Sequence, residues 1–133
     1  MTVSSGAAKR IADDILLTTD QILAISIVDN KGSILAAKSK EPFKDAFEVT
    51  EDAEKYAATL AIGILTLVNE LKDTFGEAQA MITIHKKCKL MLLPVPLYQM
   101  VVGLVFQPSV NVEDYYNIAN KIERLFAYTA RSQ

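Results

Sequence analysis

Histidine and cysteine are nearly absent from this chain of 133 residues, which contains one of each. A single cysteine, Cys88, excludes an intramolecular disulfide framework and suits a reducing compartment. A structural metal site needs about four convergent ligands, and beyond His85 and Cys88 there is no second histidine or cysteine to supply them. We therefore expect no metal and no cofactor, and we expect a cytoplasmic protein.

Other absences narrow the class of protein further. The formal net charge is −2 and the pI is near 5.4, which argues against nucleic acid as the main partner. The N-terminus lacks the long apolar segment of a secretory signal. Residues 90–112 are uncharged, but prolines at 94, 96 and 108 argue against a membrane-spanning helix there. We expect no transmembrane segment.

Catalytic motifs are missing as well. No GxxxxGK[ST] sequence is present, so the chain is not a P-loop nucleotide hydrolase. Lysines at 86, 87 and 89 would favour a Cys88 thiolate, but no carboxylate lies nearby in sequence to orient His85 as its base. The acidic clusters at 13–14 and 51–54 fit a helix surface and a helix N-terminus. We expect no enzymatic activity.

A long apolar helix is predicted in the middle of the chain, where residues 56–68 carry no charged side chain. Thr50 can cap the N-terminus of a helix and Gly76 can end it, which predicts a helix of roughly 24 residues between them. One stripe of this helix has the spacing of a face packed on a core. The stripe consists of Ala57, Leu60, Ala61, Ile64, Val68, Leu71 and Phe75.

The opposite side of this helix carries small and apolar residues, so its middle has no polar face. Such a helix is buried on more than one side, and in so short a chain we expect a second copy to provide the second cover. A loop over residues 39–49 of the same chain is the alternative. Ile62 and Leu65 would anchor the dimer, and Gly63 would let two helices approach closely. The predicted dimer interface consists of Ala58, Thr59, Ile62, Gly63, Leu65, Thr66, Met81 and Thr83.

Two further helices are predicted near the ends of the chain. Ser4 or Ser5 can cap a helix over residues 5–19, and Asn111 with Asp114 can cap a final helix. The spacing of apolar residues predicts the buried faces of both. These are Ala8, Ile11, Ala12, Ile15 and Thr19 in the first helix, and Tyr115, Ile118, Ala119, Ile122, Leu125, Phe126 and Thr129 in the last.

Five segments have the composition of β-strands. The first two flank the turn residues 29–32 and predict a hairpin. The third alternates with a period of two, which indicates one wetter face and a place at the sheet edge. The last two are continuous apolar runs typical of strands buried on both faces, the first of them ended by Pro94 and Pro96. The ranges are 22–28, 33–38, 77–86, 90–95 and 100–106.

The predicted order is α-β-β-α-β-β-β-α. Strands buried on both faces need helices on both faces of the sheet. We therefore predict an α+β fold in which a single antiparallel five-stranded sheet lies between helices, as one domain over residues 1–133. The first and last helices should cover one face and the long helix the other.

This order, the hairpin ISIVDNKGSILAAK, the long apolar helix and the run IHKKCKLMLLPV…MVVGLVF together resemble the roadblock/longin superfamily, with its profilin-like layout. The leading helix favours the roadblock branch of dynein light chains and bacterial GTPase regulators. The resemblance covers nearly the whole chain. It implies a homodimer or heterodimer built from the long helix and the following strand, with the two sheets joined edge to edge. Such an assembly serves as a platform for small Ras-like GTPases or motor complexes.

Two functions are therefore considered. The first is a non-enzymatic dimeric scaffold or regulatory module that docks a partner, most simply a small GTPase or another roadblock-like protein. The basic cluster His85, Lys86, Lys87 and Lys89 is a candidate docking contact for an acidic partner or for membrane headgroups. Lysines at a hairpin tip also protect sheet edges, which is the alternative. The alternative is a small-molecule sensor with a pocket between the sheet and the long helix, lined by Phe43, Phe47 and Phe106.

Overall fold

The elements follow the predicted order. The computed structural model describes all residues except 1–2, 19, 41–50, 112–114 and 133. The first half of the chain contains α1 (Ser5–Thr18), β1 (Ile22–Asp29), β2 (Ile34–Ser39) and α3 (Glu51–Phe75). The second half contains β3 (Met81–Ile84), β4 (Lys89–Val95), the short 3₁₀-helix η1 (Pro96–Tyr98), β5 (Met100–Phe106) and α4 (Tyr115–Ser132).

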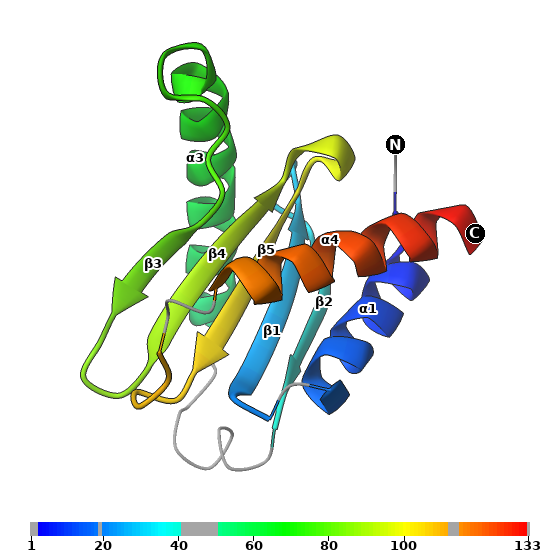
Figure 1. Cartoon of the computed structure of the whole chain (residues 1–133), viewed down its shortest axis with the longest axis vertical. Coiled ribbons are helices and arrows are strands. Elements are labelled where there is room, and N and C mark those ends of the chain that lie inside the picture. Colours follow the sequence, from blue (N-terminus) through cyan, green and yellow to red (C-terminus); the bar gives the residue numbers. More distant parts are fainter. Residues whose placement is uncertain (1–2, 19, 41–50, 112–114, 133) are drawn as a thin grey trace.

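The strands form one antiparallel sheet of five strands in the order β2-β1-β5-β4-β3. Helices α1 and α4 lie on one face and α3 crosses the other (Figure 1). The α+β class, the single sheet and the distribution of helices over its two faces are as predicted. Strand β3 is an edge of the sheet, which its alternating pattern also predicted.

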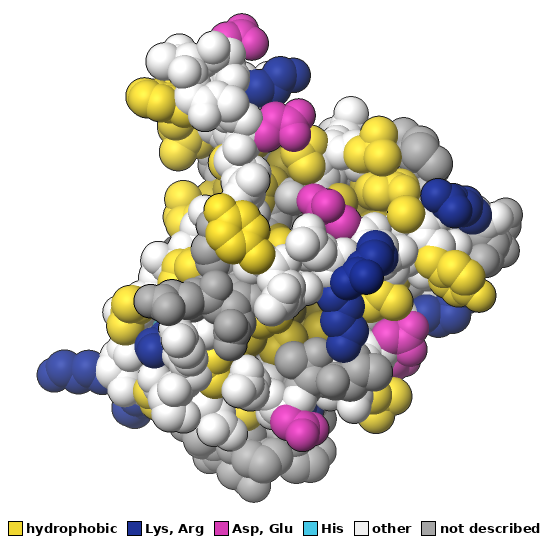
Figure 2. Space-filling model, viewed as in Figure 1, with side chains coloured by type: hydrophobic (Ala, Val, Ile, Leu, Met, Phe, Trp, Pro, Cys, Tyr) yellow, Lys and Arg dark blue, Asp and Glu magenta, His cyan; other side chains and the backbone are white. Residues whose placement is uncertain are grey.

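Helix α3 has 25 residues and extends beyond the strands that it crosses (Figure 1). Its C-terminal end stands clear of the strands, and the space-filling view shows this end projecting from the body of the molecule (Figures 1 and 2). Gly76 ends the helix as predicted: its φ is +82°, and its N–H donates to the Lys72 carbonyl at 2.9 Å. The left-handed conformation favours glycine at this position.

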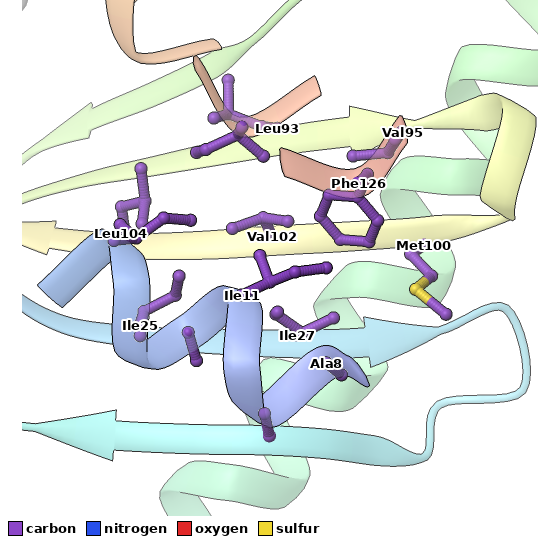
Figure 3. Packing of buried hydrophobic residues seen from close by; sticks show 14 of the residues in the cluster. Ala8, Ile11, Ile25, Ile27, Leu93, Val95, Met100, Val102, Leu104 and Phe126 are labelled. Atoms are coloured by element: carbon purple, nitrogen blue, oxygen red, sulfur yellow. The ribbon is translucent and has the colours of Figure 1, made fainter. Parts of the chain in front are cut away.

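The main core lies between the sheet and helices α1 and α4 (Figure 3). Alternate residues of each strand point into it, and Ile11 from α1 and Phe126 from α4 pack over them. The predicted buried faces of the outer helices are largely confirmed. Ser4 caps α1, since its Oγ accepts a hydrogen bond from the Ala7 N–H at 3.1 Å. Fully or nearly buried are Ala8, Ile11, Ala12, Ile15, Ile122, Phe126 and Thr129.

Strand β3 is shorter than predicted, and Pro94 explains why. The hairpin tip is closed by the His85 N–H, which donates to the Cys88 carbonyl at 2.9 Å. In an antiparallel ladder every second pair is hydrogen-bonded, so the following bonded pair of β3 and β4 is Thr83–Leu90 and the next is Met81–Leu92. The same register then sets residue 79 opposite Pro94, which has no N–H to donate. The ladder therefore begins at Met81 and not at residue 77.

Several boundaries differ from the prediction. Strand β4 begins one residue early, at Lys89, and ends at Val95 as predicted, so of the two prolines Pro96 ends it and begins η1. Strand β2 includes Ser39, whereas the rest of the predicted loop from residue 41 onward, with Phe43 and Phe47, lies outside the described residues. The same holds for Thr19 and Asp114, and for the side chain of Tyr115.

Candidate dimer and docking surface

Helix α3 rests on the sheet along a narrow line. Ala61 and Ile64 are buried against the strands, and half-buried Leu65 packs beside them. The strand residues of this small cluster come from the centre of the sheet and are Val28, Leu92 and Val101. Within the part of the chain that the structure describes, the face of the sheet under α3 therefore has a much smaller core than the face under α1 and α4.

The flank of α3 beside this line is apolar and exposed. Leu67 is 45% exposed and Phe75 is 78% exposed, and Leu60 and Leu71 are also largely accessible. The prediction that Leu60, Leu71 and Phe75 pack on the core is therefore wrong. The helix touches β4 and β5, and its last turns run past the end of the sheet (Figure 1), so no layer of the described chain covers this flank.

This exposed flank faces the β3 edge. A hollow of about 170 Å³ separates it from the segment that leads into β3. The helix contributes Ile64, Leu67, Val68, Leu71 and Phe75 to the lining, and the rest comes from Gly76, Glu77, Ala78, Ala80, Met81 and Pro94. We call Leu60, Leu67, Leu71 and Met81 the edge flank. The periodicity of the sequence could not identify the helical residues of the edge flank as exposed. An apolar stripe that packs on a sheet and one that packs on a second chain have the same period.

The sequence-predicted interface is split between two surfaces. At about 100° per residue, Ile62 lies about 140° around the helix from Leu67 and so faces away from β3. Ile62, Thr59, Gly63 and Thr66 are exposed on the side turned away from the sheet, and we call them the outer face. Met81 and Thr83 lie on β3. Leu65 packs on the sheet, and the side chain of Ala58 lies outside the described residues.

The free edge of β3 offers backbone hydrogen-bonding groups. Because Met81 and Thr83 form hydrogen-bonded pairs with β4, the N–H and C=O groups of Ile82 and Ile84 point the other way, out from the sheet. The side chain of Ile84 is 70% exposed. An edge with unpaired backbone groups and apolar side chains is a template for pairing with another strand.

The candidate docking cluster lies at the β3–β4 hairpin tip, where basic side chains project from the molecule at the lower left of Figure 2. His85 Nε2 lies 2.9 Å from Thr83 Oγ1. Lys89 Nζ donates to the Val110 carbonyl at 2.7 Å and so bends back to the body of the protein. Lys86 and Lys87 are exposed, and no described residue forms an ion pair with either of them.

Chemistry at this tip finds no support in its geometry. Burial raises the pKa of the Cys88 thiol above its ordinary value, which disfavours the reactive thiolate. His85 is turned to Thr83. No cluster of His, Cys, Asp or Glu suited to a metal ion occurs among the described residues. Among the helices that the structure describes, none is long and apolar enough to cross a membrane.

Of the predicted lining residues of the sensor pocket, only Phe106 is among the described residues, and it lies elsewhere. Phe106, one of its predicted lining residues, is fully buried in the core beneath α1 and α4, on the face opposite α3. A larger open groove of about 910 Å³ lies on that same side, between η1 and α4. Its rim carries Glu77, Glu123 and Arg124 and its floor is apolar, with Leu97 exposed at its edge.

Comparison with known proteins finds similarity at the level of structure only. No protein-family model matches the chain, and no curated protein matches its sequence. Among solved structures, the gliding protein MglB from Thermus thermophilus is similar with a TM-score of 0.67 and 15% identity, over 100% of this chain and 96% of that one. A roadblock/LC7 domain from Streptomyces avermitilis gives 0.60 and 10%, over 93% and 92%.

A profilin is similar at a greater distance. LokiProfilin1, solved in complex with rabbit actin, has a TM-score of 0.52 and 14% identity over 94% of this chain and 97% of that one. The resemblance inferred from the order of elements is thus confirmed in three dimensions. The leading α1, the β1–β2 hairpin, the long α3 and the three following strands give this chain a roadblock/longin fold.

Proposed function

We propose that this chain is a non-enzymatic dimeric scaffold that docks a partner protein of the small Ras-like GTPase class. The observation that carries the proposal is the edge flank, in which exposed leucines of α3 lie beside Met81 at the unpaired edge of the sheet. Full burial of an exposed leucine side chain stabilises the buried state by about 1.5–3 kcal/mol. Covering Leu60, Leu67 and Leu71 in both copies is therefore a substantial driving force for association.

One arrangement covers both features at once. A two-fold axis perpendicular to the sheet, next to β3, places the two α3 helices side by side on the same face. The same axis makes the two β3 strands antiparallel neighbours, so the two sheets join edge to edge. A two-fold axis along the strands would instead set the helices on opposite faces and leave each edge flank in water.

The outer face then becomes the docking platform. In the paired arrangement Thr59, Ile62, Gly63 and Thr66 of both copies lie on the surface of the helix pair. Their side chains are small or apolar, which suits a flat protein contact. The fold favours a small GTPase as partner by analogy, since roadblock domains include bacterial GTPase regulators. The sensor alternative has less support, because the hollow beside α3 is smaller than the roughly 300–1,000 Å³ of typical ligand sites.

The mass of the protein in solution tests the dimer. Light scattering should give twice the chain mass for the wild type and the single-chain mass for Leu67→Glu, because two glutamates would meet inside the helix pair. Leu67 is already 45% exposed in one chain, so the variant should remain folded by circular dichroism. Ile62→Glu, a matched change on the outer face, should stay dimeric. A monomeric wild type at high concentration would refute the scaffold.

A further inference from the structure

The chain carries two charged regions of opposite sign at the two ends of β3. The hairpin tip at one end presents the exposed cations Lys86 and Lys87. At the other end, the last turns of α3 and the segment after it contain Glu70, Asp73 and Glu77 against one lysine. Within the described residues, neither Glu77 nor the tip lysines form an ion pair. The two regions cannot meet inside one chain, because β3 separates them.

Pairing of β3 with a second copy brings these regions together. We propose that two copies pair in the register in which Ile82 lies opposite itself, so that Lys86 and Lys87 of each copy contact Glu77 of the other. The proposal rests on the dimer of the proposed function and specifies how its edges join. The basic tip is then part of the interface between copies and not a contact for a third molecule.

The faces of the strand restrict the possible registers. Residues directly opposite each other in an antiparallel pair point to the same face of the sheet. With the axis perpendicular to the sheet, a residue of even number must therefore face one of even number. This leaves registers centred on a residue and excludes those centred between residues. The two residues in the middle of β3, Ile82 and Thr83, give the registers in which the two strands overlap most.

Hydrogen bonding favours the register centred on Ile82. The outward-pointing backbone groups belong to Ile82 and Ile84, and by the same alternation to Ala80. Centring on Ile82 makes hydrogen-bonded pairs of Ile82 with Ile82 and of Ala80 with Ile84. Centring on Thr83 also pairs Ile82 with Ile84, but it leaves Ala80 opposite the hairpin tip, where the strand has ended.

Charge favours the same register. When Ile82 faces itself, residue 87 of one copy lies opposite residue 77 of the other, and Lys86 lies next to this pair. Opposite charges across a sheet stabilise pairing, and they also disfavour wrong registers. The second copy is the preferred occupant because its acidic region has the matching position, whereas a membrane surface would contact only the tip.

Charge reversal tests the contact. Lys86→Glu/Lys87→Glu should raise the dissociation constant of the dimer about tenfold at low salt, because each dimer repeats the contact twice. Adding Glu77→Lys should restore it, and the difference should shrink at about 0.5 M salt. The control Lys9→Glu/Lys31→Glu changes net charge equally, at exposed positions on α1 and the β1–β2 turn, and should leave the constant unchanged. Sedimentation velocity measures all four proteins.

Cysteine cross-linking reads the register directly. In a Cys88→Ser background, Ile82→Cys should form an intermolecular disulfide, since paired Cα atoms lie about 5.5 Å apart. Thr83→Cys should cross-link much more slowly, because its own copy is displaced along the strand. Faster cross-linking of Thr83→Cys would overturn the proposed register.

The outcomes separate this inference from the proposed function. If Leu67→Glu dissociates the dimer but Lys86→Glu/Lys87→Glu leaves its dissociation constant unchanged, the inference is overturned and the scaffold proposal stands. The same result with loss of binding to anionic vesicles would assign the tip to a membrane surface. A failure of Glu77→Lys to restore the dimer would also overturn the proposed contact. A wild type that never dimerises refutes both proposals.

Discussion

At the scale of single residues, Asp29 shows how local chemistry fixes the first hairpin. Its Oδ1 accepts hydrogen bonds from the N–H groups of Lys31 at 2.9 Å and Ser33 at 2.8 Å. Gly32 completes the turn with a φ of +84°. These residues could be identified from sequence alone, because Asp at the first position and Gly near the end are strongly preferred in such a turn. A second bond, from Asn30 Nδ2 to Gln99 Oε1 at 2.7 Å, joins distant turns and has no sequence signal.

Removing the Asp29 carboxylate should weaken the fold. Asp29→Ala should lower the free energy of unfolding by about 1–2 kcal/mol, because two backbone donors lose their acceptor at a partly exposed site. Asp29→Asn keeps an acceptor oxygen and should lose less. Urea unfolding of the three proteins measures the difference. Equal losses for the two variants would show that the two hydrogen bonds do not set the stability of this turn.

At the scale of elements, the sequence predicts well which helices and strands occur and in what order. It predicts poorly where a strand ends and which sides of a helix are covered. Each helix and strand has its own period and its own capping or turn residues, so all the predicted elements occur. The end of β3 depends on Pro94, which lies on another strand, and on which pairs carry hydrogen bonds. The two flanks of α3 depend on the width of the sheet beneath it. Neither fact is encoded within the element itself.

The effect of Pro94 on β3 can be measured. Pro94→Val restores an N–H opposite residue 79 and should lengthen the β3–β4 ladder, so the Gln79 amide should exchange with solvent at least about tenfold more slowly. Pro96→Val, outside the ladder in η1, is the matched control and should leave Gln79 unchanged. Unaltered exchange at Gln79 in Pro94→Val would mean that some other feature ends β3.

At the scale of the whole molecule, the two faces of the sheet are unequal. Among the described side chains, the face under α1 and α4 holds the larger cluster, and the face under α3 holds a small one. The chain therefore completes one layer by itself and leaves the other with an apolar flank and a free edge. Association with a second copy is the simplest way to cover this flank, and in the proposed helix pair the outer face of both copies stays accessible.

That outer face should govern partner binding independently of dimer formation. Ras-like GTPases loaded with GDP or with a non-hydrolysable GTP analogue should bind the dimer, and Ile62→Glu should weaken this binding at least about tenfold, because a charge at the centre of a docking contact is costly. The mass of Ile62→Glu should remain that of a dimer. Isothermal titration calorimetry measures the affinity. Arg124→Glu, on the rim of the groove beside α4, is the control. If Arg124→Glu removes binding and Ile62→Glu does not, the partner docks on the opposite side of the sheet and the helix pair serves assembly alone.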